Sequence, residues 1–178
     1  MIAFIGITGS GKTTQAEIIG KRLGCPVIST GTVLRTQLKG KLAKEVADGK
    51  VISDEVTIPL LEQELKKVGV DQKEVILDGS PRSLDQAKWL ISKFRSGEFM
   101  FTAFIHLRAS EAVVKKRLLA RGRYDDTEKS ISKRFNEYHK KVEPVLSYLR
   151  EQGYSVLEID GDDSISKDTA AITKALGI

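Results

Sequence analysis

The sequence predicts a three-layer α/β domain in which a five-stranded parallel sheet lies between two layers of helices. Five short apolar runs alternate with longer amphipathic stretches along the 178 residues, which is the order of strands and helices in α/β proteins. The apolar runs are nearly continuous, as expected of parallel strands that are buried on both faces. A glycine-rich segment joins the first run to the first amphipathic stretch, and this is the usual place for a phosphate-binding loop.

The apolar runs and the amphipathic stretches set the boundaries of the predicted elements. We predict strands at residues 2–5, 26–28, 75–77, 103–107 and 156–159. We predict helices at residues 12–23, 32–47, 54–68, 84–94, 110–121, 127–151 and 166–176. Ser53 and Ser110 stand where a helix cap is expected, each directly before an acidic residue and an apolar stretch. Right-handed crossovers between the strands then leave few topologies.

One domain accounts for the whole chain, residues 1–178, because the length suits a single core and no repeat or linker interrupts it. Between the second and third predicted strands, however, the chain contains more helix than a simple crossover needs. We interpret residues 29–68 as a helical insertion that covers a substrate and not as a separate domain.

The composition excludes several classes of protein. With 40% hydrophobic and 30% charged residues, the chain is typical of a globular protein and not of a disordered one. The net charge of +5 suits either nucleic acid or polyphosphate ligands, and the lack of a groove-reading motif favours the second. The single cysteine, Cys25, excludes an internal disulfide and a CxxC metal site. Because no apolar run suits a bilayer span or a signal segment, we expect a cytoplasmic protein without a membrane partner.

The segment GITGSGKT at residues 6–13 matches the phosphate-loop pattern G-x-x-x-x-G-K-[ST] in full. Glycine backbones let successive N–H groups turn inward around phosphates, and the following helix adds its positive N-terminal end. We expect Lys12 at the outer phosphates and the Thr13 hydroxyl at a magnesium ion. The pattern indicates a P-loop NTPase fold that binds a nucleoside triphosphate, but it does not identify the reaction.

Basic residues later in the chain narrow the reaction. Arg117 and Arg121 are four apart and therefore share one helical face, while Arg123 and Arg134 follow in the next segments. Guanidinium groups grip phosphate with two parallel hydrogen bonds and stay charged, although a single arginine on a helix is often only a solvated surface residue. Asp78 ends the third predicted strand, where its carboxylate can hold magnesium directly or through water. Such a set suits phosphoryl transfer between two anions.

Several segments, in order along nearly the whole chain, resemble adenylate kinases. They are ISTGTVLR at 28–35, GKVISDEV at 49–56, LDGSPR at 77–82 followed by Gln86-Ala87, RLLARGRYDD at 117–126, and then Arg134, Tyr138 and Glu143-Pro144. The resemblance implies reversible transfer of a phosphoryl group from Mg-ATP to AMP, which gives two ADP. It also implies that residues 29–68 are the NMP-binding insertion.

The resemblance implies which residues contact each nucleotide. The ATP-binding set is Gly9, Ser10, Gly11, Lys12, Thr13, Thr14, Arg117, Arg121 and Asp163. The AMP-binding set is Thr30, Gly31, Arg35, Lys50, Val51, Ile52, Gly79, Ser80, Pro81, Arg82, Gln86, Arg123 and Arg134. The catalytic set is Lys12, Arg82, Arg117, Arg121, Arg123 and Arg134, with Mg²⁺ held by Thr13 and Asp78. Gln86 would read the adenine edge by hydrogen bonding, and a surface glutamine is the alternative interpretation.

Other interpretations stay open at this point. A UMP/CMP kinase or another nucleoside monophosphate kinase would share the reaction class, and a P-loop ATPase acting with nucleic acid would account for the basic charge. His106 and His139 are interpreted as core or surface histidines, because no third metal ligand or adjacent nucleophile accompanies them. We expect ATP and AMP as partners, no nucleic acid, and a monomer or small homo-oligomer.

The sequence departs from the adenylate kinase pattern at the phosphate loop and near the expected acceptor site. Lys12 is followed by two threonines, where the family usually has glycine and then threonine. Thr32 stands where the family usually has aspartate, and Ser80 where it usually has phenylalanine. Thr32 and Ser80 both lie in segments expected near the acceptor.

A further departure concerns the lid. Only Gly122 separates Arg121 from Arg123, whereas the family inserts a loop or a small domain there. We therefore expect a vestigial lid at residues 121–126. Water exclusion would then fall to residues 31–67, to neighbouring loops or to a partner subunit.

Overall fold

The computed structural model describes residues 1–47, 52–122 and 126–178 of the chain. It contains a five-stranded sheet with the strand order β2-β3-β1-β4-β5, and every adjacent pair is parallel. The strands are β1 Ile2–Ile5, β2 Val27–Ser29, β3 Ile76–Asp78, β4 Ala103–Arg108 and β5 Val156–Asp160. The predicted parallel sheet is confirmed, and each strand boundary agrees with the sequence to within about one residue.

The helices are α1 Lys12–Leu23, α2 Thr30–Gln37, α3 Gly40–Ala47, α4 Asp54–Lys67, α5 Leu84–Arg95, α6 Glu111–Arg121, α7 Glu128–Glu151 and α8 Ile165–Leu176. The single helix predicted at 32–47 is wrong, because α2 and α3 are separate elements in this stretch. The chain turns out of α2 at Leu38, which is extended, and Gly40 has a φ of +59°. That left-handed conformation favours glycine, so residue 40 begins a new helix instead of continuing the old one.

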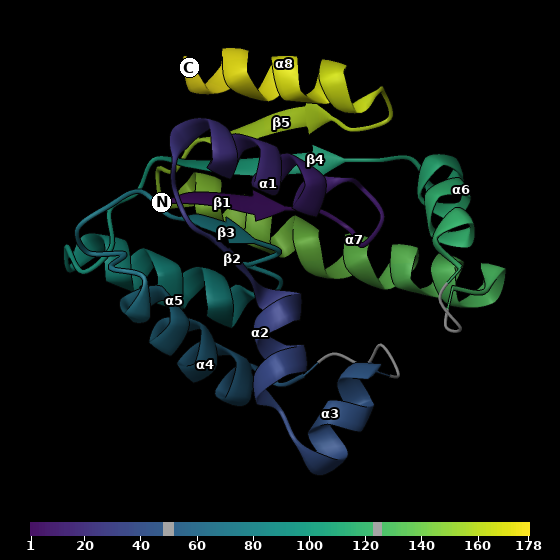
Figure 1. Ribbon diagram of the computed structural model, residues 1–178, viewed down its shortest axis with the longest axis horizontal. Coiled ribbons are helices and arrows are strands. Elements are labelled where there is room, and N and C mark those ends of the chain that lie inside the picture. The colour runs from purple at the N-terminus through teal and green to yellow at the C-terminus, as the bar shows by residue number, and fades with distance from the viewer. Residues whose placement is uncertain (48–51, 123–125) are drawn as a thin grey trace.

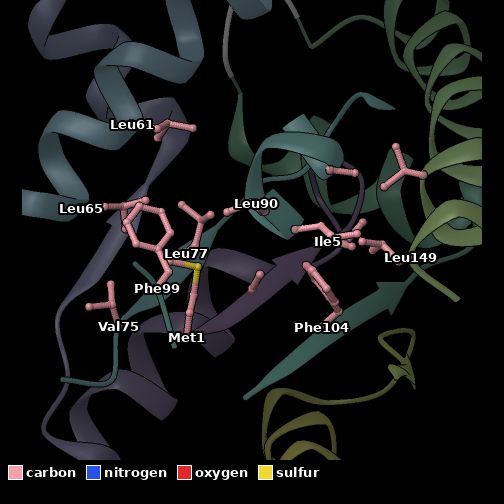
Figure 2. Close-up of a cluster of buried hydrophobic side chains, with 14 of the residues drawn as sticks. Met1, Ile5, Leu61, Leu65, Val75, Leu77, Leu90, Phe99, Phe104 and Leu149 are labelled. Carbon is pink, nitrogen blue, oxygen red and sulfur yellow. The ribbon is translucent and has the colours of Figure 1, made fainter. Parts of the chain in front are cut away.

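Helices cover both faces of the sheet, which completes the predicted three layers (Figure 1). Along β1, Ile2 and Phe4 pack with residues of α1 and α8, whereas Ala3 and Ile5 pack with residues of α4, α5 and α7. This alternation follows from the twofold repeat of a strand, and burial of both sets explains why the run has no polar residue. Figure 2 shows part of the larger cluster, in which Leu77 and Phe104 from the sheet lie among helical leucines.

The register of the parallel strands brings their carboxyl ends to one edge of the sheet. Phe4 of β1 is paired with Asp78 of β3, and Ile5 is paired with His106 of β4. The chain leaves β1 into the glycine-rich loop and leaves β3 into residues 79–82, so these two segments meet next to each other. Ligands bind at this edge in open α/β sheets. No helix in the described part of the chain is both long and apolar enough to cross a membrane.

Candidate active site

The loop between β1 and α1 has the backbone of a phosphate-binding loop. A Cβ atom on Gly6 would lie 2.8 Å from both the Leu107 carbonyl oxygen and the Ser10 hydroxyl, so only glycine fits between them. Gly11, at the N-cap of α1, has a φ of +98°, which a residue with a side chain rarely adopts. The sequence therefore folds here into a turn that directs the free N–H groups at the start of α1 toward an anion.

Two neighbouring clefts open beside this loop. The first, of about 250 Å³, is lined by Gly9, Gly11, Lys12, Thr13, Thr14, Arg117, Leu118 and Arg121. The second, of about 240 Å³, is lined by Gly11, Thr14, Gln15, Arg117, Ile165 and Asp168. Most of the residues expected to bind ATP thus line the first cleft, while Ser10 is buried beneath the loop and the Asp163 side chain is exposed beyond it.

Lys12 is a buried cation that contacts the loop backbone. Its side chain is buried and its Nζ donates a hydrogen bond to the Ile7 carbonyl oxygen, 3.3 Å away. Burial, together with the positive charge of Arg82, lowers the pKa of Lys12 to about 8, although Asp78 opposes the shift. The cost of keeping this ammonium buried falls when an anion enters, so the site is prepared for negative charge.

Thr13 and Asp78 form the oxygen pair expected to hold magnesium. The Thr13 hydroxyl donates to Asp78 Oδ2 over 2.7 Å, and Asp78 Oδ1 is buried without a hydrogen-bond partner. Hydroxyl and carboxylate oxygens are ligands that Mg²⁺ prefers. Within residues 1–47, 52–122 and 126–178, no group of three or more His, Cys, Asp or Glu side chains is placed to hold a metal ion. The pair therefore fits an ion that takes its other ligands from phosphate and water.

Arg82 lies beside Lys12 at the end of β3. Its Nε donates to the Gly79 carbonyl oxygen, and a Cβ on Gly79 would lie 2.7 Å from an Arg82 guanidinium nitrogen and 3.4 Å from Lys12 Cε. Gly79 has a φ of +81°. The backbone conformation therefore favours glycine here, and the side chains of Arg82 and Lys12 both approach this residue next to the phosphate loop.

Gln86, at the first turn of α5, is buried, and other residues of the protein satisfy most of the hydrogen-bonding capacity of its amide. Its Oε1 accepts hydrogen bonds from the Ser80 hydroxyl at 2.7 Å and from the Arg82 backbone N–H at 2.9 Å. Its Nε2 donates to Asp54 Oδ1 at 2.7 Å. Sequence reasoning expected Gln86 to face the acceptor base but did not find Asp54, because that contact joins residues far apart in the chain.

Other residues expected at the acceptor lie around α2. Thr30 is buried and its hydroxyl has no hydrogen-bond partner among the described residues, which leaves it free for a ligand. Arg35 is exposed and donates to the Thr32 hydroxyl at 3.2 Å, beside Gly31. Ile52 is buried. Lys50, Val51 and Arg123 lie outside the described residues.

Arg117 holds the phosphate loop against the loop that follows β5. Its guanidinium donates to the carbonyl oxygens of Ser10 at 3.0 Å, Gly161 at 2.8 Å and Asp163 at 3.1 Å. These bonds join the two connecting segments directly. The expected contact between Arg117 and the transferring group stays a prediction.

Asp126 joins two of the expected arginines. It accepts two hydrogen bonds from Arg121, at 3.0 and 2.9 Å, and a longer one of 3.4 Å from Arg134. The Asp126 side chain is fully buried, whereas those of the two arginines are 30% and 24% exposed. Fork-shaped pairing of this kind fixes the direction of a guanidinium. The sequence placed Asp126 in the arginine-rich segment but did not indicate a role for it. The nearby arginines were the only signal that it pairs with a guanidinium group.

A chain of polar side chains centred on the buried His106 lies behind the site. His106 Nδ1 is 2.8 Å from Glu158 Oε2 on β5, and His106 Nε2 is 3.1 Å from the Tyr138 hydroxyl on α7. Because the carboxylate can only accept, Nδ1 carries the proton and Nε2 accepts from tyrosine. The interpretation of His106 as a core histidine agrees with its burial, although its hydrogen-bond partners could not be read from the sequence.

Comparisons with known proteins show what this chain is similar to. The family model described as adenylate kinase matches residues 4–154 of the chain. The chain is 33% identical over 181 residues to the adenylate kinase of Corynebacterium urealyticum, with 98% of each sequence covered. It is 35% identical over 182 residues to that of Prochlorococcus marinus, covering 98% of this chain and 97% of the relative. It is 34% identical to adenylate kinase 1 of Nostoc sp., covering 99% and 98%.

Proposed function

The chain belongs to the adenylate kinase family, and on that premise we propose how its residues move the terminal phosphoryl group of Mg-ATP to AMP. The observation that carries the proposal is the meeting of Lys12 and Arg82 over Gly79, next to the Thr13–Asp78 pair. A phosphate-loop cation and the expected acceptor-phosphate clamp thereby share one space at the carboxyl edge of the sheet. Transfer between two bound nucleotides needs such a space.

On the donor side, the phosphate loop and Lys12 hold the triphosphate. The N-terminus of α1 directs backbone N–H groups at it, and Lys12 supplies a buried positive charge at its outer end. Thr13 and Asp78 would hold magnesium, directly or through water. When bound, magnesium neutralises charge on the outer phosphates and helps to orient them.

On the acceptor side, Arg82 would grip the AMP phosphate, while Thr30, Arg35 and Gln86 surround the nucleoside. Arg121 and Arg134, both fixed by Asp126, would stabilise the charge that spreads over the transferring group. We propose that Arg117 acts indirectly: its three hydrogen bonds to carbonyl oxygens keep the phosphate loop in place. No covalent protein intermediate is needed, because positioning and charge stabilisation account for this kind of transfer.

The wider arrangement is also part of the proposal. Residues 29–68 would act as the NMP-binding insertion of a single domain, and residues 121–126 as a vestigial lid. The single free cysteine, Cys25, suits a cytoplasmic location. We propose nucleotides and not nucleic acid as partners, and a monomer or small homo-oligomer as the assembly.

An acceptor panel tests the proposed reaction. The protein is incubated with Mg-ATP and with AMP, UMP or CMP in turn, and the nucleotides are separated and quantified. We expect AMP to give ADP fastest and the reverse reaction to regenerate ATP and AMP from ADP. Turnover with UMP or CMP but not with AMP would overturn the acceptor assignment. Turnover only in the presence of nucleic acid would overturn the kinase assignment itself.

A further inference from the structure

We propose that Asp54 is a positioning residue for acceptor specificity: it fixes the Gln86 amide so that one N–H, and not the carbonyl oxygen, is left for the acceptor base. This inference rests on the proposed function, because it takes Gln86 to lie at the AMP site. Asp54 is the first residue of α4, and Gln86 lies in the first turn of α5. The contact therefore joins the helical insertion to the segment that clamps the acceptor phosphate.

The hydrogen bonds of Gln86 determine which way its amide points. Arg82 presents a backbone N–H to Oε1, and a backbone N–H can only donate. Asp54 presents a carboxylate oxygen to Nε2, and an ionised carboxylate can only accept. If the amide flipped, two donors would face each other on one side and two acceptors on the other. The observed orientation is thus specified from both ends.

The remaining hydrogen-bonding capacity follows by counting. The amide oxygen has two lone pairs, and the Ser80 hydroxyl and the Arg82 N–H occupy both. The amide nitrogen has two N–H groups, and Asp54 takes one of them. Gln86 is buried, so its last N–H must find a partner in a ligand or lose a hydrogen bond. That group is a donor, so it can bind the ring nitrogen at position 1 of adenine, but it cannot bind the adenine amine.

Removal of Asp54 should therefore loosen the reading of the base without disturbing transfer. Without the carboxylate, Nε2 loses its anchor and the Gln86 side chain can rotate to present either amide atom. We take the remaining N–H to face position 1 of the ring, where AMP has an acceptor and IMP has an N–H donor. A freed amide should therefore discriminate less between the two nucleotides. The phosphate loop and Arg82 keep their own contacts in this variant.

The experiment measures kcat and KM for AMP, IMP and ATP in Asp54→Ala, Asp54→Asn and the wild-type protein. We expect Asp54→Ala to raise the KM for AMP about tenfold, as loss of a hydrogen bond to a charged group does, and to lower the AMP-to-IMP ratio of kcat/KM by a similar factor. The kcat for AMP and the KM for ATP should stay near the wild-type values. Asp54→Asn should restore most of the selectivity, because the asparagine carbonyl can still accept from Gln86.

Two further variants keep the result interpretable. Glu55→Ala removes an exposed acidic residue from the same turn of α4, so it controls for the loss of negative charge at a helix N-terminus. Asp54→Ser keeps a residue that suits a helix start but is too short to reach Gln86, and it replaces Asp54→Ala if that variant does not fold. It should show the same loss of selectivity.

Three outcomes overturn the inference. They are an unchanged AMP-to-IMP ratio in both Asp54→Ala and Asp54→Ser, an equal effect of Glu55→Ala, and failure of Asp54→Asn to restore selectivity. Failure of the proposed function would look different, because the wild-type protein itself would then form no ADP from ATP and AMP.

Discussion

The Thr13 hydroxyl donates a hydrogen bond to Asp78 Oδ2 over 2.7 Å, and this bond joins the start of α1 to the end of β3. The two residues are 65 positions apart in the chain. Asp78 leaves its second oxygen buried and without a partner, which costs free energy unless a ligand satisfies it. An oxygen pair with unused capacity, placed where the outer phosphates are expected, supports the proposed magnesium site.

The first prediction concerns this pair. Asp78→Asn and Thr13→Val should each raise the magnesium concentration needed for half-maximal activity by about tenfold or more, since lost ligands or their neighbours commonly weaken metal sites to that extent. Thr13→Ser keeps the hydroxyl and serves as the matched control, with a requirement close to that of the wild type. Activity titrated with magnesium at fixed total ATP checks the prediction. Equal titration curves for Thr13→Val and Thr13→Ser would contradict it.

The second prediction concerns the two cations that meet over Gly79. Lys12→Ala and Arg82→Ala should each lower the rate of transfer by about two to three orders of magnitude, because each removes charge that stabilises the transferring group. Lys21→Ala and Arg95→Ala change basic residues in the last turns of α1 and α5, away from the site, and control for net charge. Steady-state kinetics with ATP and AMP provide the measurement. Rates near wild type in either Lys12→Ala or Arg82→Ala would contradict the assigned roles.

The third prediction follows from the lowered pKa of Lys12. Lys12 is protonated below a pH of about 8 in the free protein, and a bound triphosphate favours its charged form. Binding should therefore weaken as the pH rises above 8, and at pH 8 it should take up about half a proton. Calorimetry in two buffers with different ionisation enthalpies measures the uptake. Lys12→Arg, whose guanidinium stays charged, should show almost none, and equal uptake in both proteins would contradict the assignment.

Much of the fold was predictable because its signals are local. The strands are short apolar runs, and the phosphate loop combines a fixed spacing with its strand–helix context. The break between α2 and α3 was missed because Leu38 continues the apolar pattern. A glycine inside a helix costs only about 1 kcal/mol, so Gly40 alone did not exclude a continuous helix. The competing turn conformation was visible only in the folded chain.

In the candidate site, too, the residues with a local sequence signal were predictable and the contacts made by tertiary packing were not. The types and spacing of Lys12, Thr13 and Arg82 are enough to indicate phosphate chemistry. The partners of these residues depend on tertiary packing, which brings Asp54 to Gln86 and seats Arg117 on three backbone carbonyls. Sequence spacing cannot distinguish an arginine that grips a ligand from one that holds a loop, because both uses need the same side chain on the same helical face.

The fourth prediction concerns acid stability. Burial lowers the pKa of His106 below its ordinary value, against the opposing effects of Glu158 and Glu143 and with a smaller lowering effect from Arg108. The unfolded chain therefore binds a proton below a pH of about 6.5 while the folded chain does not, so folding stability should fall as the pH drops through that range. Protonation of His106 would also oblige the Tyr138 hydroxyl to change from donor to acceptor in this contact.

Urea unfolding of the wild type and of His106→Gln at pH 7.5, 6.5 and 5.5 tests this expectation. At pH 7.5 the variant should be less stable by about 1 kcal/mol, as expected for imperfect replacement of buried hydrogen bonds. The difference should narrow as the pH falls, because only the wild type loses the contribution of a neutral histidine. His139→Gln, at the other, exposed histidine, is the control and should follow the wild-type profile. Parallel profiles for wild type and His106→Gln would contradict the prediction.

The fifth prediction concerns closure of the site. Residues 122–127 alone connect α6 to α7, so little chain is present there to cover the phosphate loop, and Arg121 beside that loop is exposed. If nothing else closes the site, water should compete with AMP for the transferring group. We expect ATP hydrolysis without acceptor to be measurable and to fall when AMP occupies the site, because AMP fills the space over Arg82. Release of phosphate from ATP, compared with ADP formation in the presence of AMP, provides the measurement.

Hydrolysis that is negligible beside transfer would instead mean that the helical insertion or a partner subunit closes the site. These two cases differ in one respect: closure by a partner subunit would make the ratio of hydrolysis to transfer depend on protein concentration.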